Sequence, residues 1–229
     1  MWDRVFSELP AFFGYYNVLF LAKAALATIG LSAIGSVTGL ISGFGLAFVR
    51  LTRARSLAPA RWLALLVTEL FRRVPFLVTL MLVFFISQLS GFDLPLFVVA
   101  LIAVFLIASA YLAEIIRSGL ESVHKNQWDA ATAMNFSLFE TVRHVIVPQA
   151  WRVILPPAFG FFVLFIKDTA LASQIGVIEL TFAGKVLNNK GFPAALVFGT
   201  LLLIYFLISY PLTRFGAHLE ARLAKPRHR

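Results

Sequence analysis

Two clusters of charged or polar residues interrupt or border long apolar runs, and they are the best candidates for chemistry in this chain. The first is Glu69 with Arg72 and Arg73, which follow at three and four residues and therefore share a helix face. The second is Asp168 with Thr169. A charge among apolar residues is costly, so it marks either a route for a polar solute or a structural ion pair. Both interpretations are open, and all five residues are candidates for lining a substrate pathway.

No group of residues typical of an enzyme accompanies these clusters. The chain has no cysteine, which excludes thiol catalysis and disulfides. Its four histidines form no pair at a metal-binding spacing, and no glycine-rich phosphate loop is present. We therefore expect a protein that is not an enzyme and holds no metal or cofactor of its own.

The composition points to a membrane protein. Of 229 residues, 60% are hydrophobic, 14% are charged and 24 are phenylalanine, whereas a soluble domain has about 45–50% apolar and about 25% charged residues. This excludes a soluble enzyme, a disordered chain and a coiled coil, and it predicts an all-α integral membrane protein in the lipid bilayer. The net charge of +9 then indicates basic cytoplasmic loops rather than nucleic-acid binding.

Five apolar segments are long enough to cross a bilayer, which takes about 20 residues each. They form one expected transmembrane domain over residues 1–229, with residues 1–13 as an amphipathic segment at the outer surface. The spans are expected at about 17–49, 62–89, 94–116, 153–171 and 193–212. In the first span, Gly35, Gly39 and Gly43 make two G-x-x-x-G pairs, which allow two helix backbones to approach closely.

Three basic segments set the expected orientation. Residues 50–61 carry four arginines and no acid, residues 117–152 are long and polar, and the tail from Arg214 has five bases and one acid. With five spans these segments share one side, so the N-terminus lies outside and the C-terminus in the cytoplasm. A cleaved signal peptide is the alternative, but Asp3 and Glu8 make the opening residues unlike its basic start.

The polar segment 117–152 has the most specific local pattern. Two short helices fit at about 127–134 and 138–145, with Asn135 at the turn between them because asparagine tolerates the left-handed conformation. Ser137 and Glu140 have the spacing of a capping box, and Pro148 is expected to end the second helix. These features predict a compact cytoplasmic knob that docks on a partner.

The amino-acid sequence of this segment resembles that of a known family. Asp129-Ala130-Ala131, then Asn135, then Val145 and Val147-Pro148 resemble the EAA loop of ABC importer permeases. Stretches that resemble the polar amino-acid uptake branch of the family are 69–75, 110–117, 147–150, 167–171 and 175–180. The family usually has Glu in place of Asp129 and Gly in place of Asn135. Aspartate keeps the charge, and asparagine keeps access to a positive φ.

The resemblance implies a type I importer permease fold with five transmembrane helices, in which the loop couples to an ATPase through a coupling helix. The ATPase-coupling residues would be Trp128, Asp129, Ala130, Ala131, Asn135, Phe136, Leu138 and Pro148. It also implies two ATP-binding subunits that hold ATP and Mg, a second permease subunit, identical or homologous, and a periplasmic substrate-binding protein. The cargo would be an amino acid, and the location the bacterial inner membrane.

Three other functions are open on the sequence. The same machine would serve an opine or another amino-acid derivative. An ion-driven secondary transporter is a second alternative, although the internal repeat typical of many such folds is not evident. The third is a membrane scaffold without transport. ATP-dependent uptake at a clamped membrane potential separates the first from the other two.

Overall fold

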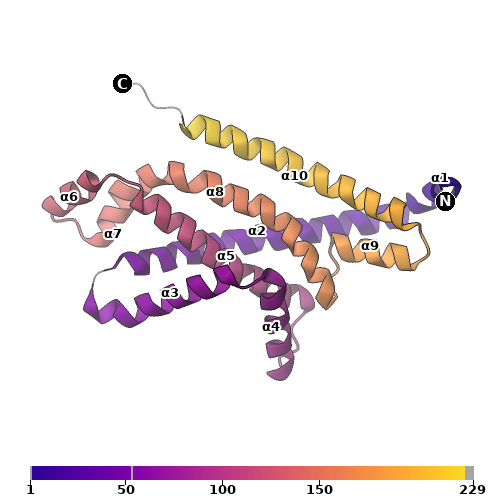
Figure 1. The fold of residues 1–229 in the computed structure, drawn as a ribbon, viewed down its shortest axis with the longest axis horizontal. Coiled ribbons are helices and arrows are strands. Elements are labelled where there is room, and N and C mark those ends of the chain that lie inside the picture. The colour runs from indigo at the N-terminus through magenta and orange to yellow at the C-terminus, as the bar shows by residue number, and fades with distance from the viewer. Residues whose placement is uncertain (1, 53, 225–229) are drawn as a thin grey trace. The chain divides into compact units, whose positions relative to one another are not determined.

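The computed structural model describes residues 2–52 and 54–224, and helices are its regular elements throughout those ranges (Figure 1). The α-helices are α1 (Trp2–Phe12), α2 (Tyr15–Leu51), α3 (Ala58–Arg73), α4 (Phe76–Leu89), α5 (Leu96–Glu121), α6 (Lys125–Ala133), α7 (Leu138–Glu140), α8 (Val147–Asp168), α9 (Leu180–Asn189) and α10 (Ala194–Ala224). Shorter turns are η1 (Arg55–Leu57), the π-turn η2 (Thr141–Ile146) and the 3-10 turn η3 (Thr169–Ile175).

Among the described residues, four helices are long and apolar enough to cross a membrane, and a bent pair brings the number to five if it counts as one span. The four are Tyr15–Leu51, Leu96–Glu121, Leu138–Ile175 and Ala194–Leu223. This confirms the all-α membrane fold with up to five spans. The helices extend beyond the expected spans, because polar residues at their ends continue the hydrogen-bond ladder after the apolar run stops.

The segment expected as one span at 62–89 is bent. Arg55–Arg73 and Phe76–Leu89 meet at an angle of 114°. Val74 has an extended conformation (φ −92°, ψ 133°), which is the conformation that a following proline imposes, and Pro75 has no backbone N–H to continue the ladder. The charged cluster at Glu69, Arg72 and Arg73 therefore lies in the last turn of α3, just before the break.

The chain divides into two compact units. The first contains the described parts of Met1–Gly35, Phe76–Val104 and Val163–Leu212, and the second those of Ser36–Pro75, Phe105–Phe162 and Thr213–Arg229. In the first unit, α1, α9 and the start of α10 gather around a common apolar cluster (Figure 1). Its fully buried members include Phe12, Leu180 and Leu187. The amphipathic helix expected at residues 1–13 thus packs its apolar side on protein.

In the second unit the glycines of α2 bring that helix close to α5. A Cβ atom on Gly39 would lie 2.5 Å from the Cβ of Ala108, and one on Gly43 would lie 2.9 Å from the backbone nitrogen of Ala113. One turn along, the hydroxyl oxygens of Ser42 and Ser109 are 2.5 Å apart. The G-x-x-x-G pattern is therefore used as predicted, for close contact between two helix backbones.

Candidate functional site

The two short helices of the polar segment are held by hydrogen bonds at their ends. At the start of α6, the backbone N–H of Asn126 donates to Nδ1 of His124 at 3.2 Å. At its end, Asn135 has φ +61°, the backbone N–H of Phe136 donates to the carbonyl of Ala131, and that of Asn135 to the carbonyl of Thr132. This is a Schellman motif, and the left-handed turn predicted at Asn135 is confirmed.

The capping box at α7 is also confirmed. The N–H of Glu140 donates to Ser137 Oγ at 3.3 Å, and the N–H of Ser137 donates to the Glu140 carboxylate at 2.8 Å. The expected helix end at Pro148 is wrong. A single helix runs from Leu138 through η2 and α8 to Ile175, because the wider π-turn before Pro148 changes which carbonyl lies beneath the proline ring.

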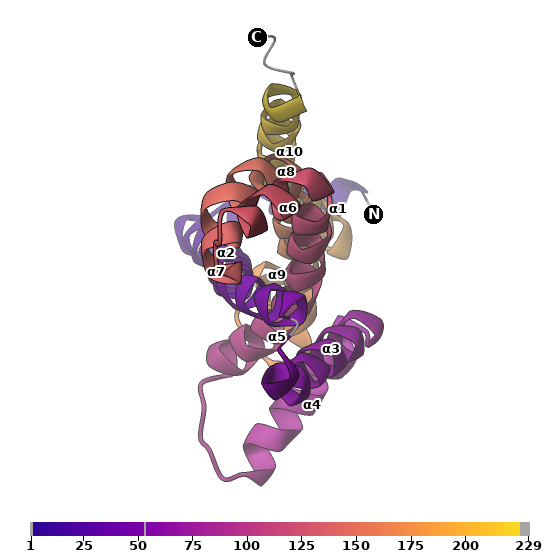
Figure 2. The same cartoon turned by 90° about the vertical axis from the view of Figure 1, so that its left-hand side faces the viewer.

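We call residues 125–146, comprising α6, α7 and η2, the docking segment (Figure 2). Its helices are tied to the long helices of the same unit. Gln149 of α8 donates to the side-chain oxygen of Gln127 at 3.2 Å, and the ring of Phe139 lies edge-on to that of Phe48 of α2, with centroids 6.2 Å apart. The docking segment is therefore a rigid knob built into its helices.

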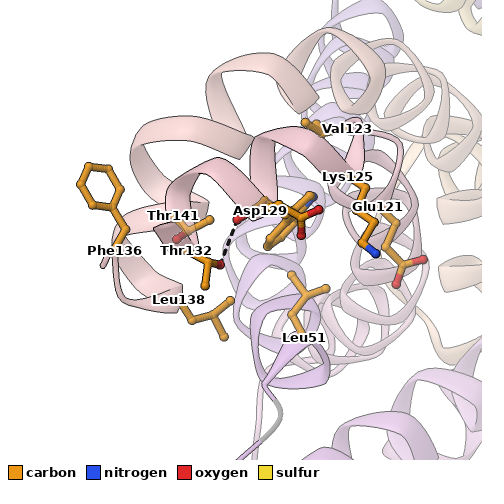
Figure 3. A pocket seen from close by; sticks show the side chains of 10 residues that line it. Leu51, Glu121, Val123, Lys125, Asp129, Thr132, Phe136, Leu138 and Thr141 are labelled. Carbon is orange, nitrogen blue, oxygen red and sulfur yellow. Dashed lines mark hydrogen bonds between the residues drawn. The ribbon is translucent and has the colours of Figure 1, made fainter. Parts of the chain in front are cut away.

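An open hollow of about 830 Å³ lies beside the docking segment and is here called the α6 hollow (Figure 3). Its lining residues are Leu51, Glu121, Val123, Lys125, Trp128, Asp129, Thr132, Phe136, Leu138 and Thr141. Apolar, acidic and basic side chains all reach it. That mixture is typical of the core and rim of a protein–protein contact rather than of a closed pocket for a small molecule.

The predicted coupling residues are divided between this hollow and the support of the knob. Trp128, Asp129, Phe136 and Leu138 line the hollow. Ala130, Asn135 and Pro148 are exposed, whereas Ala131 is buried and accepts the hydrogen bond that closes α6. Six lining residues were not among the predicted coupling residues. Two of them, Leu51 and Thr141, reach the hollow because α2 ends beside it and the π-turn faces it.

The Glu69 cluster pairs as predicted but belongs to a larger network. The carboxylate of Glu69 lies 2.6 Å from Arg73 and 3.6 Å from Arg72. Glu114 of α5 accepts hydrogen bonds from Arg50 at 3.0 Å and from Arg117 at 2.5 Å, and it forms an ion pair with Arg72 at 3.5 Å. Ion pairs also run along α5 from Glu114 through Arg117 to Glu121.

An open hollow of about 290 Å³ adjoins this network, lined by Glu69, Arg72, Arg73 and Tyr111. The Tyr111 hydroxyl donates to the carbonyl of Arg72 at 3.1 Å, which satisfies one of the carbonyls that the helix break leaves open. The three predicted pathway residues thus share one polar hollow. Their charges are largely paired within the protein, which agrees with the structural interpretation, and their role along a substrate pathway stays a prediction.

The residues of the second cluster differ from each other. Asp168 is half-buried at the end of α8, and within the described residues it makes no hydrogen bond or ion pair. Thr169 is buried, and its hydroxyl already donates to the carbonyl of Ile166 at 2.9 Å. Of the two, Asp168 retains a free acceptor for a bound cation or ammonium group.

Fold and site together define a membrane-spanning helical protein with a rigid polar knob between two long apolar helices. The comparison with known families agrees. The family described as "Binding-protein-dependent transport system inner membrane component" matches residues 35–225. The chain belongs to this family, and it is the membrane permease subunit of such a system, as its sequence predicted.

Curated relatives extend over nearly the whole chain. It is 32% identical to the probable amino-acid ABC transporter permease protein YckA of Bacillus subtilis (strain 168), with 97% of this chain and 96% of that protein covered. It is 30% identical to the glutamine transport system permease protein GlnP of Escherichia coli (strain K12), with 97% of both covered. The L-cystine transport system permease protein TcyB of B. subtilis (strain 168) is 34% identical, with 86% and 83% covered.

Solved structures share the fold. A structure described as an amino acid ABC transporter with histidines matches with a TM-score of 0.81 and 25% identity, covering 90% of this chain and 94% of that one. An inward-facing structure of the MetNI methionine ABC transporter matches with a TM-score of 0.77 at 18% identity, covering 93% and 100%. The second likeness concerns the fold alone.

Proposed function

We propose that this chain forms half of the translocation pathway of an ATP-driven amino-acid importer, and that its docking segment couples the pathway to a separate ATPase subunit. The observation that carries this proposal is mechanical. The second half of the knob is the start of the helix Leu138–Ile175. A hydrogen bond ties the knob to α8, and a ring contact ties it to α2. A force applied to the knob is therefore transmitted to the helices on which the knob is built.

The proposed partners follow because this chain forms the pathway while another subunit hydrolyses ATP. Two ATP-binding subunits, which bind ATP and Mg, dock below the membrane, and a second permease subunit completes the pathway. A periplasmic substrate-binding protein delivers the cargo from outside. The basic segments 50–61 and 117–152 support a docking segment on the cytoplasmic side of the bacterial inner membrane, with the N-terminus outside.

Amino acids are the cargo that we propose, because YckA and GlnP carry amino-acid or glutamine transport in their names. An α-amino acid carries an ammonium group. Asp168 would bind this group, because its half-buried carboxylate has no hydrogen-bond or ion-pair partner among the residues that the structure describes. Glu69, Arg72 and Arg73, which line one polar hollow, and Thr169, beside Asp168, are the other candidates along the route.

Coupling is tested with the double variant Trp128→Ala plus Asp129→Arg in the complex with its ATP-binding subunits. Both residues line the α6 hollow, so we expect uptake into proteoliposomes to fall at least tenfold relative to ATP hydrolysis, with membrane insertion intact. Asp93→Arg is the matched control, because Asp93 is also an exposed aspartate but lies in the loop before α5. Normal uptake by the double variant would show that the docking segment does not couple.

A further inference from the structure

The last part of α10 carries a line of basic side chains. Arg214, His218 and Arg222 follow one another at intervals of four residues and therefore share one helix face. All three are exposed. In the part of the chain that the structure describes, none of them forms an ion pair or a side-chain hydrogen bond. We call these three residues the α10 stripe.

Packing of α10 against α8 fixes the direction in which the stripe points. Gly216 lies two residues before His218, which is about 200° around an α-helix. A Cβ atom on Gly216 would lie 2.8 Å from Cδ1 of Phe159 in α8, so this side of α10 is in close contact with α8. Glu220, the one acid in the sequence of α10, lies two residues after His218 and therefore also on the opposite side. The stripe points away from α8 and is not neutralised by its own helix.

The length of α10 sets how far the stripe extends beyond the membrane. Residues 194–213 carry no charge, and about 20 such residues cross the hydrocarbon core. Arg214 then lies at the edge of that core, and Arg222 lies eight residues or about 12 Å further along the helix. The headgroup layer is about 5–8 Å thick on each side. Lipid headgroups therefore reach Arg214, whereas Arg222 lies beyond them.

The stripe is suited to a protein surface that lies below the membrane. Ala217 and Ala221, which are exposed beside it, are small enough to let another surface approach the helix. The docking segment and the end of α10 belong to the same compact unit, and both lie toward the left-hand side of Figure 1. A partner that binds the docking segment is therefore on the correct side to meet the stripe as well.

We propose that the α10 stripe docks on an acidic surface of the ATP-binding subunit, as a second contact beside the docking segment. This inference rests on the proposed function, which places that subunit at the docking segment. An anionic membrane would meet only the Arg214 end of the stripe. A second copy of this chain carries a net charge of +9, so its overall charge opposes contact with a basic face.

The test is the affinity of the purified ATP-binding subunit for the full chain, measured by biolayer interferometry. The chain is held in nanodiscs of phosphatidylcholine, a lipid without net charge. We expect Arg222→Gln to weaken binding about threefold, within the range of one exposed ion pair, and the triple variant Arg214→Gln, His218→Gln, Arg222→Gln to weaken it about tenfold. High salt should remove most of the difference between the triple variant and the unmodified chain.

Two variants are matched controls. Arg55→Gln removes the same charge from an exposed arginine of η1, and Glu220→Gln changes a charge on the opposite side of α10. Neither should weaken binding. Arg222→Lys keeps the charge and should bind like the unmodified chain, which separates loss of charge from damage to the helix.

Four results would overturn the inference. Unchanged binding of the triple variant would exclude the contact, and equal losses for Arg55→Gln and Arg222→Gln would indicate diffuse attraction instead. An effect confined to Arg214→Gln and to nanodiscs that contain phosphatidylglycerol would assign the stripe to lipid. Self-association of the chain that Arg222→Gln abolishes would assign it to a second copy.

The docking segment separates failure of this inference from failure of the proposed function. If Trp128→Ala plus Asp129→Arg weakens binding and the triple variant does not, only the second contact is wrong. If the ATP-binding subunit does not bind the unmodified chain, or if neither set of substitutions affects its binding, the proposed function is wrong as well.

Discussion

Replacing Gly39 by alanine tests the close contact between α2 and α5 most directly. The added Cβ would lie 2.5 Å from the Cβ of Ala108, 2.9 Å from its carbonyl carbon and 3.0 Å from the nitrogen of Ser109. Non-bonded carbon atoms prefer about 3.5–4.0 Å. The helices must therefore separate by about 1 Å or more, because backbone atoms and a Cβ cannot rotate away.

The size of the effect follows from two opposing contributions. Overpacking costs about 1–3 kcal/mol, while alanine in place of glycine inside a helix gains about 0.5–1 kcal/mol. Separation also stretches the contact between the hydroxyls of Ser42 and Ser109, now 2.5 Å. We expect Gly39→Ala to lower the free energy of unfolding by about 1–2 kcal/mol.

Gly45→Ala in the same helix is the matched control. Nothing lies within 4 Å of a Cβ at Gly45, so this variant gains the helix preference without the clash and should be stabilised by about 0.5–1 kcal/mol. The assay is thermal unfolding of the purified chain in detergent. The two melting temperatures should differ by about 4–10 °C. A Gly39→Ala protein as stable as the unmodified chain would refute the close contact.

Three further predictions concern hydrogen bonds and ion pairs. Ser137→Ala removes the capping box and should lower the stability of this helix start by about 1 kcal/mol. Amide exchange at Glu140 should therefore become faster in Ser137→Ala but not in Ser137→Thr. Glu179 is buried and accepts hydrogen bonds from the N–H groups of Thr181 and Phe182. Glu179→Ala should therefore lower the free energy of unfolding, measured by thermal unfolding, by about 1–2 kcal/mol, and Glu179→Gln should lower it less. Glu114→Gln leaves three arginines without their shared carboxylate. In thermal unfolding it should lower the free energy of unfolding by about 2 kcal/mol, which is less than the about 3–5 kcal/mol lost when a fully buried ion pair is broken.

Each of these results has a contrary outcome. Unchanged exchange in Ser137→Ala would mean that packing alone fixes the docking segment. Equal losses for Glu179→Ala and Glu179→Gln would mean that the charge, rather than the acceptor, matters at that site. Full stability of Glu114→Gln would show that the arginine network is neutral for stability.

The contribution of Glu179 to stability also depends on pH. Burial raises the pKa of the Glu179 carboxyl, although hydrogen bonds from Thr181, Phe182 and Tyr205 oppose the shift. The folded chain therefore holds this proton more tightly than the unfolded chain does, and its contribution to stability declines as the pH rises through the folded pKa. Glu179→Gln should remove that slope from the pH profile of the melting temperature.

Local features of this protein were predictable because their causes lie within a few residues. The apolar runs predicted membrane helices, and Ser137 with Glu140 predicted the capping box that is present. Asn135 predicted the left-handed turn. Pro148 was misinterpreted because a proline ends a regular helix, whereas here a π-turn precedes it. That turn depends on packing around Thr141 and Ile146, both of which are buried.

The sequence by itself determined the class of protein, since hydrophobicity, the positions of basic residues and helix-cap chemistry act at short range. Only the tertiary structure decided which distant residues meet. Glu114 pairs with Arg50 and Arg72, and Gly39 lies against Ala108. Such pairings depend on how the helices cross, and many residues shared along both helices set that crossing.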